Sequence, residues 1–208
     1  MKTISLNGLE ITKYQQSSIK IKTHNLIIYL DPYKVTDEPG DLILITHEHF
    51  DHFDKVSIFK LQKEKTLVIA PEYLASRIAG NVRGIKAGET LEVLKTKLST
   101  YSSYNIGKSY HPKERGDLSF LIEIMGKRIF FSGDSDKTPE MEGLENIDLA
   151  FLPIGDTYTM SEEEAAQAVA VIKPKIVIPM HYGQIAGGGD PQKFASLVGE
   201  NAKVMILE

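Results

Sequence analysis

The first third of the chain is a series of short apolar runs separated by turn residues. Runs rich in β-branched and aromatic residues cover residues 4–6, 9–14, 19–23 and 26–30. The pairs Asn7-Gly8 and His24-Asn25 lie between successive runs, and short runs joined in this way are typical of antiparallel strands and tight turns. The pattern therefore predicts an antiparallel meander that ends at Asp31-Pro32, because proline cannot continue a central strand.

The rest of the chain alternates strand-like and helical segments. Further strands are predicted over residues 42–46, 66–70, 82–85, 90–95, 97–104, 118–125, 128–132, 147–153, 175–180 and 203–207. Helices are predicted over residues 71–79, 161–172 and 190–198. Ser161 is the expected N-cap of the second helix, because Glu164 completes a capping box. A meander followed by strands that alternate with helices indicates an α/β fold of two sheets packed face to face, with helices outside.

Two connections have their own expected geometry. Gly126-Lys127 lies between two predicted strands and is expected to form a two-residue hairpin turn. After Asp54 the spacing of apolar residues is only loosely helical, and Asp54 is the expected cap of the segment that follows.

Length and composition indicate an ordinary globular protein. The chain has 208 residues, of which 42% are hydrophobic and 25% charged, and we expect a single domain over residues 1–208. The net charge is -4 and the lysines and arginines are scattered, so we do not expect a nucleic-acid partner.

The sequence excludes thiol chemistry and suggests a location. No cysteine is present, which excludes disulfides, thiolate zinc sites and cysteine nucleophiles. The first residues lack the apolar stretch of a secretory signal, and no apolar run approaches the length of a membrane span. We therefore expect a cytoplasmic protein without a membrane partner. The oligomeric state cannot be predicted from the sequence.

Residues 42–54, LILITHEHFDHFD, combine a buried strand with a dense polar cluster. His47 and His49 are two residues apart, so at an extended strand end they can face one ion together. Asp51 and His52 follow, and they can face a second ion where the chain turns. Imidazole and carboxylate ligands suit zinc, manganese or iron. A polar loop that happens to follow a strand is the alternative.

Three more residues of the same chemistry end predicted strands. His111 follows a strand-rich stretch, Asp134 follows the strand over residues 128–132 at a glycine turn, and His181 ends the strand KIVIPM. Loops at strand ends are where functional side chains commonly converge. These positions favour the metal site over the polar loop.

The ordered motif resembles the metallo-β-lactamase superfamily of hydrolases. The resemblance spans residues 31–181 and implies a four-layer αββα sandwich of two mixed sheets flanked by helices. It implies a first metal held by His47, His49 and His111 and a second held by Asp51, His52 and His181, with Asp134 between them. We expect two divalent ions, zinc above all, with manganese or iron as alternatives. The pattern is similar to that of the small single-domain branch that contains ascorbate-6-phosphate lactonase-like hydrolases.

Four residues near these positions have candidate supporting roles. Asp31 matches an early aspartate of the family, which implies that it orients a loop or a ligand; a plain Asp-Pro turn is the alternative. Lys113 and Arg115 follow His111 and could contact an anionic substrate, although two solvated loop cations explain them equally well. Tyr182 could donate a hydrogen bond to a developing oxyanion or simply pack at a strand end.

The expected activity is hydrolysis of a small-molecule ester, lactone or phosphodiester by a metal-bridging hydroxide. Asp134 would hold the two metals, and Asp51 would orient the nucleophile and relay its proton. The alternatives are a non-haem iron oxidoreductase on the same fold and a phosphodiesterase acting on nucleic acid or phospholipid. His49 stands where the di-iron oxidoreductases have glutamate, which favours hydrolysis.

Overall fold

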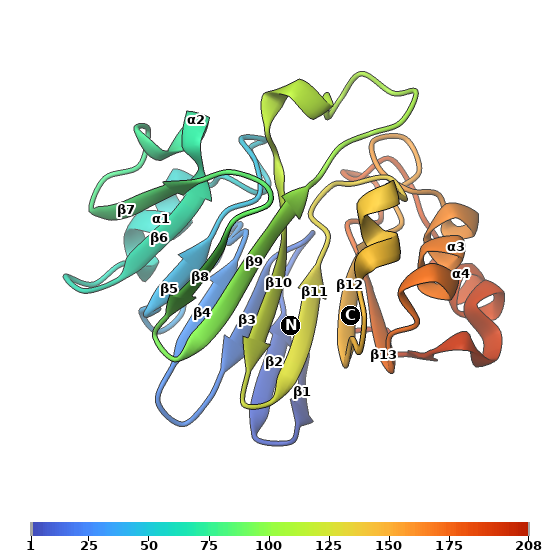
Figure 1. Cartoon of the computed structure of the whole chain (residues 1–208), viewed down its shortest axis with the longest axis horizontal. Helices are drawn as coiled ribbons and strands as arrows, with labels where there is room; N and C mark the ends of the chain where they lie inside the picture. Colours follow the sequence, from blue (N-terminus) through green and yellow to red (C-terminus); the bar gives the residue numbers. More distant parts are fainter. Residues whose placement is uncertain (1, 208) are drawn as a thin grey trace. The chain divides into compact units, whose positions relative to one another are not determined.

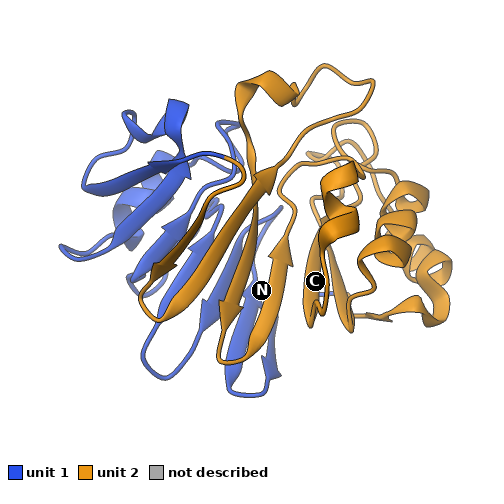
Figure 2. Cartoon of the chain, in the orientation of Figure 1, with its two compact units in different colours: residues 1–86, 207–208 blue, residues 87–206 orange. Residues whose placement is uncertain are grey.

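The computed structural model describes residues 2–207 and divides into two compact units (Figure 2). The first unit comprises residues 1–86 with 207–208, and the second comprises residues 87–206. Each unit contains one seven-stranded sheet with both parallel and antiparallel pairs, together with its own helices. The predicted α/β class, with two mixed sheets and flanking helices, is confirmed. The single domain over residues 1–208 stays a prediction.

The sheet of the first unit follows chain order, from an antiparallel half to a parallel half (Figure 1). Its strands are β1 (Lys2–Leu6), β2 (Leu9–Lys13), β3 (Ile19–Lys22), β4 (Ile27–Leu30), β5 (Leu42–Leu44), β6 (Leu67–Pro71) and β7 (Asn81–Ile85). Strands β1 to β4 pair antiparallel, so the predicted meander is confirmed. Asn7 and Gly8 adopt φ of 49° and 87°, the conformation that a two-residue hairpin turn requires. Strands β4 to β7 pair parallel.

Two helices belong to the first unit, α1 (Lys55–Leu61) and α2 (Glu72–Ala75). The loosely spaced segment after Asp54 is a regular helix, and the Asp54 side chain caps it by accepting from the backbone N–H of Val56 at 3.0 Å. Ile58 and Leu61 of α1 are buried in one apolar cluster with Ile43 and Val68 of the sheet. Tertiary packing, more than sequence periodicity, stabilises this short helix.

The helix predicted over residues 71–79 is shorter than expected. Pro71 is the last residue of β6 and pairs with Ile85 of β7, so it cannot occupy the first helical turn. After α2 the chain continues in turns closed by hydrogen bonds between residues three apart, such as that from the N–H of Arg77 to the carbonyl of Leu74 at 3.0 Å. Gly80, at φ 101°, then redirects the chain into β7.

The sheet of the second unit also runs from antiparallel to parallel. Its strands are β8 (Thr90–Val93), β9 (Thr96–Ser102), β10 (Leu118–Ile124), β11 (Lys127–Phe131), β12 (Leu149–Pro153), β13 (Ile176–Met180) and β14 (Lys203–Val204). Strands β8 to β11 pair antiparallel and β11 to β14 pair parallel. The hairpin between β10 and β11 turns at Met125-Gly126, one residue before the predicted Gly126-Lys127, because Lys127 pairs with Ile124. Met125 adopts φ 50° there, which sequence propensity alone does not favour.

Helices α3 (Glu162–Ile172) and α4 (Pro191–Val198) bury their apolar faces in the second unit. Short 3₁₀ turns are η1 (Lys113–Arg115), η2 (Pro139–Gly143) and η3 (Gly199–Asn201). The predicted N-cap of α3 is confirmed, because Ser161 Oγ accepts from the N–H of Glu164 at 3.2 Å. Asp190 caps α4 in the same way, through the N–H of Gln192 at 2.8 Å. Val169 and Phe194 pack in one cluster with Leu152 of the sheet.

None of the helices within residues 2–207 is long and apolar enough to cross a bilayer. The longest of them, α3, has 11 residues, whereas a span needs about 20.

An ion-paired network in the first unit leads to a stability prediction. Burial disfavours the charged form of Asp37, but bonds from Lys20 at 2.7 Å and from the Tyr14 hydroxyl outweigh it and lower the pKa of Asp37 to about 2. Because the folded pKa lies below the unfolded value, this stabilisation is present above about pH 4 and is lost as the pH falls through 2. We expect Asp37→Asn to lower the free energy of unfolding by about 1 kcal/mol at pH 7.

Urea denaturation of both proteins between pH 2 and pH 7 measures this difference. The difference between wild type and Asp37→Asn should shrink as the pH falls from 4 toward 2. A difference that stays constant across this range would contradict the assigned pKa.

Candidate metal centre

The first unit holds five of the predicted site residues around the end of β5. The strand is central in the parallel half of the sheet, and the chain leaves it into a tight loop in which the N–H of Phe53 bonds to the carbonyl of His49 at 2.8 Å. His47, Asp51 and His52 are buried in this loop, with exposed fractions of 1%, 5% and 0%. The short loop compresses the imidazole and carboxylate groups into one small volume.

His47 and His49 point ring nitrogens toward each other. Nε2 of His47 lies 3.1 Å from Nδ1 of His49, and the two rings meet edge to face with their centroids 4.6 Å apart. Two nitrogens bound to one tetrahedral zinc would be about 3.3 Å apart, given bonds of about 2.05 Å. The observed separation therefore fits a shared ion.

Thr46 fixes the tautomer of His47. The Thr46 hydroxyl uses its single O–H to donate a hydrogen bond of 2.6 Å to Asp31 Oδ2. The Thr46 hydroxyl oxygen also lies 2.9 Å from Nδ1 of His47, so it accepts a hydrogen bond from the N–H at that position. Nε2 of His47 is then the unprotonated nitrogen, which is the form that binds metal.

Asp31 holds the rest of this arrangement. Its Oδ2 accepts from Nδ1 of His52 at 2.7 Å, and its Oδ1 accepts from the N–H of Thr46 at 2.8 Å. The residue is fully buried and adopts φ 42°, a strained conformation of the kind that clusters at functional sites. Burial raises the pKa of Asp31, while His52 and Thr46 act in the opposite sense by bonding to the carboxylate. Asp31 directs Nε2 of His52 toward the side of Asp51, whose Oδ2 lies 3.8 Å away.

The second unit brings together the other three predicted ligands. Strands β11 and β13 belong to the parallel half, so their carboxyl ends lie at one edge of the sheet, and Asp134 and His181 follow them. Oδ2 of Asp134 lies 3.1 Å from Nε2 of His181 and 3.5 Å from Nε2 of His111. All three residues are at most 3% exposed. One carboxylate oxygen thus faces two imidazoles.

Asn105 fixes the orientation of His111. Its Oδ1 accepts from Nδ1 of His111 at 2.9 Å and from the N–H of the same residue at 3.2 Å. In the neutral ring, Nε2 of His111 is therefore the unprotonated nitrogen, as in His47. In both units, a buried side-chain oxygen bonds Nδ1 of a histidine, so that Nε2 is the nitrogen that can bind a metal.

Glycines keep the segment after His181 tightly packed. His181 itself adopts φ 48°. A Cβ on Gly155 would lie 2.7 Å from the carbonyl oxygen of His181, and one on Gly189 would lie 2.2 Å from the carbonyl oxygen of Ile154. Only glycine permits these approaches, so the glycine-rich stretch locks the backbone beside His181.

The three candidate substrate contacts all have protein partners. Lys113 bonds Glu140 at 2.9 Å and the Tyr104 hydroxyl at 3.2 Å. Arg115 donates from Nε to both carboxylate oxygens of Asp117, at 2.9 and 3.0 Å. Tyr182 packs against the apolar cluster of the second unit. Substrate contact by these residues stays a prediction.

Sequence reasoning missed three residues that orient the predicted ligands. Thr46 immediately precedes His47, and its position beside a ligand was a usable clue. Asp136, two residues after Asp134, accepts from Nδ2 of Asn105 at 3.0 Å. Asn105 lies in an irregular loop, and nothing in its sequence surroundings distinguishes it from other loop asparagines.

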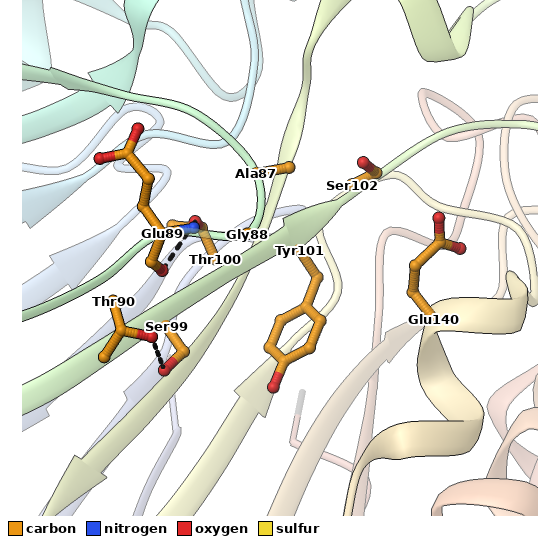
Figure 3. A pocket seen from close by; sticks show the side chains of 9 residues that line it. All are labelled: Ala87, Gly88, Glu89, Thr90, Ser99, Thr100, Tyr101, Ser102 and Glu140. Atoms are coloured by element: carbon orange, nitrogen blue, oxygen red, sulfur yellow. Dashed lines mark hydrogen bonds between the residues drawn. The ribbon is translucent and has the colours of Figure 1, made fainter.

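A separate hollow of about 340 Å³ lies over β8 and β9 of the second unit (Figure 3). Its walls include Glu89, Tyr101 and Glu140, and a hydrogen bond of 2.9 Å joins Thr90 to Ser99. None of its lining residues is a predicted ligand, so this hollow is not the candidate metal centre.

The donor set suits a divalent metal ion. His47, His52 and His111 each direct Nδ1 to a buried protein oxygen. Their Nε2 atoms lie 3.1 Å from His49, 3.8 Å from Asp51 and 3.5 Å from Asp134, respectively. Within the first unit, donor atoms of Asp31, His47 and His52 lie within 4.8 Å of one another. Neutral imidazoles held in this way are typical metal ligands. Fold and donor chemistry together indicate a metal-binding protein of the α/β class.

Comparison with known proteins agrees with this class. The family model of the beta-lactamase superfamily domain matches residues 10–181, and the chain belongs to this family. A UPF0173 metal-dependent hydrolase of Lysinibacillus sphaericus is 35% identical, and the match covers 96% of each chain. A UPF0173 metal-dependent hydrolase of Thermococcus onnurineus is also 35% identical, over 87% of this chain and 88% of that one. The protein is a metal-dependent hydrolase of the metallo-β-lactamase superfamily.

Solved structures show the same fold. A Parabacteroides distasonis protein assigned as a metal-dependent hydrolase is 31% identical, with a TM-score of 0.87 over 99% of this chain and 96% of that chain. Igni18, a metallo hydrolase from Ignicoccus hospitalis, has a TM-score of 0.79 at 22% identity, over 96% of this chain and 95% of that chain. The likeness to Igni18 concerns the fold alone.

Proposed function

We propose that the chain is a two-metal hydrolase that cleaves a small ester, lactone or phosphodiester. The observation that carries the proposal is the shared state of His47, His52 and His111, each of which gives Nδ1 to a buried acceptor. A polar loop without a metal would not require three imidazoles that are all held through Nδ1. They are expected if each Nε2 binds a metal.

The proposed ligand sets follow the family resemblance and the donor chemistry. His47, His49 and His111 would hold one ion, and Asp51, His52 and His181 would hold the other. Asp134, whose Oδ2 faces both His111 and His181, would contribute to both. Zinc is the proposed metal, because nitrogen-rich sets of this kind suit it, and manganese or iron are the alternatives. When bound, the two ions would supply a bridging hydroxide and would polarise the substrate oxygen that gains negative charge.

The chain's own residues would then orient reactants and move protons. Asp51, which is buried and next to His52, would orient the nucleophile and accept its proton. Tyr182 would donate a hydrogen bond to the oxygen that becomes negative. Lys113 and Arg115 would attract an anionic substrate group, but to contact it directly they would have to exchange their bonds to Glu140 and Asp117.

The proposed partner is a small molecule, and the proposed location is the cytoplasm. The net charge of -4 and the scattering of lysines and arginines along the sequence argue against an extended positive surface for nucleic acid. We therefore propose neither a nucleic-acid nor a membrane partner.

Metal removal and return tests the proposal. The full chain should lose hydrolysis of p-nitrophenyl phosphodiesters, lactones or thioesters after chelation, and it should regain activity as about two equivalents of Zn²⁺ are added back. Activity that survives complete metal removal would contradict the proposal. Oxygen consumption by the iron-loaded chain, without hydrolysis of any substrate class, would support the oxidoreductase alternative in its place.

A further inference from the structure

A buried carboxylate outside the proposed ligand set is linked to His111 through one intervening side chain, that of Asn105. Asp136 is 1% exposed and lies two residues after Asp134. Its Oδ1 accepts from Nδ2 of Asn105 at 3.0 Å and from Nζ of Lys108 at 3.2 Å, and its Oδ2 accepts from the N–H of Ile106 at 2.7 Å. Both oxygens of the carboxylate are therefore used to hold the loop that precedes His111.

The Asn105 side chain can bond in only one orientation. Its Nδ2 faces two acceptors, Asp136 Oδ1 at 3.0 Å and the carbonyl of Tyr158 at 3.1 Å. Its Oδ1 faces the backbone N–H of His111, which is always a donor, and the Nδ1 of the same residue. A flipped amide would place its oxygen against two oxygens and its NH₂ group against that N–H, losing three bonds whatever the tautomer of the ring. Asp136 thus acts with the Tyr158 carbonyl and the N–H of His111 to set which atom of Asn105 faces the ring.

Lys108 offsets the buried charge of Asp136. Its Nζ also donates to the carbonyls of Asp156, at 3.1 Å, and of Thr159. Its side chain is 27% exposed, whereas that of Asp136 is 1% exposed. The lysine therefore joins the loop before His111 to the loop after β12 and places a positive charge beside the buried carboxylate.

We propose that Asp136 is a positioning residue that acts through Asn105 to fix His111 as the Nδ1–H tautomer. The imidazole then directs Nε2 toward Asp134 Oδ2, 3.5 Å away, on the side where the proposed metal would bind. The proposal deepens the proposed function, on which it rests for the role of His111 as a ligand. A dedicated carboxylate would raise metal affinity by removing the unproductive tautomer, by fixing the ring orientation and by raising the basicity of Nε2.

The test uses two substitutions of Asp136 in the full chain. Asp136→Leu removes both acceptor oxygens and excludes water, and Asp136→Ser removes them with less strain. In each zinc-free variant, ¹⁵N NMR at pH 8 should show His111 shifting from the Nδ1–H form toward a tautomer mixture. Zn²⁺ affinity, measured by competition with a chelator, should fall by about tenfold to a hundredfold.

Asp148→Leu and Asp148→Ser are the matched controls. Asp148 is a buried aspartate of the same unit that bonds Lys175 at 2.8 Å and the N–H of Arg128 at 3.0 Å. It lies at the amino ends of β11 and β12, whereas Asp134 and Asp136 follow the carboxyl end of β11. These variants should lower the melting temperature by a similar amount while leaving the His111 tautomer and Zn²⁺ affinity unchanged.

Three results would overturn the proposal. The first is a folded Asp136 variant that keeps both the His111 tautomer and the Zn²⁺ affinity of the wild type. The second is an equal shift of both properties in the Asp148 controls. The wild type decides the matter even if no variant folds, because a predominantly Nε2–H His111 in the zinc-free chain would refute the proposal. A tautomer shift without any change in Zn²⁺ affinity would contradict His111 as a ligand, and thus the proposed function, while leaving the action of Asp136 on His111 intact.

Discussion

Replacing His49 with alanine is expected to remove one equivalent of bound metal and to abolish most of the hydrolytic activity. Nε2 of His47 and Nδ1 of His49 are 3.1 Å apart, so the loss of one ring leaves an incomplete ligand set. The charge stabilisation supplied by a metal ion is worth several kcal/mol in the transition state, which corresponds to a fall in kcat/KM of about a thousandfold. Metal analysis and kinetics on the purified variant measure both effects.

Glu48→Gln is the matched control for this substitution. Glu48 lies between the two histidines in sequence, but its side chain pairs with Arg77 at 2.5 Å. Metal content and kcat/KM should stay at the wild-type level in this variant. If His49→Ala retained full metal content and full activity, His49 would not be a ligand.

Replacing Asp31 with asparagine is expected to weaken metal binding without removing any ligand. Asparagine tolerates the left-handed conformation of this position, so the backbone should be preserved. The new amide can no longer accept from Thr46 N–H, Thr46 Oγ and His52 Nδ1 together, and one favourable arrangement reverses the tautomer of His52. We expect Zn²⁺ affinity to fall by about tenfold to a hundredfold. The free energy of unfolding should fall by about 2 kcal/mol.

Asp41→Asn in the same unit separates the two effects. Asp41 accepts from the N–H of Ile27 at 2.8 Å and pairs with Lys63 at 2.6 Å, so its substitution should affect stability alone. Chelator competition and urea denaturation of both variants provide the comparison. Wild-type Zn²⁺ affinity in Asp31→Asn would show that Asp31 only forms an Asp-Pro turn after β4.

The sequence predicts most of this fold because local and tertiary preferences agree. The Asn7-Gly8 turn, the Ser161 cap and the Asp190 cap each use the residue that the local backbone favours. Prediction fails where tertiary contacts override local preference. Met125 enters a left-handed turn because the pairing of β10 with β11 demands it, and Pro71 completes a parallel strand.

The candidate site shows the same division. Histidines and aspartates at strand ends can be recognised from their type and spacing, and the family resemblance then assigns them as ligands. Their binding of metal stays a prediction. The groups that orient them cannot be recognised in this way. Asn105 acts on His111 six residues away through an irregular loop, and its amide is set by Asp136, which is 31 residues distant in the chain. Such hydrogen bonds depend on loop conformation, which has no periodic pattern in the sequence.

A crystal structure of the zinc-loaded full chain, with anomalous diffraction recorded at the zinc edge, tests the central claim most directly. The account predicts two anomalous peaks about 3.5–4 Å apart. One should be bound by His47, His49 and His111, and the other by Asp51, His52 and His181, with Asp134 contacting both. Peaks bound elsewhere, or ions held without any residue of the second unit, would contradict it.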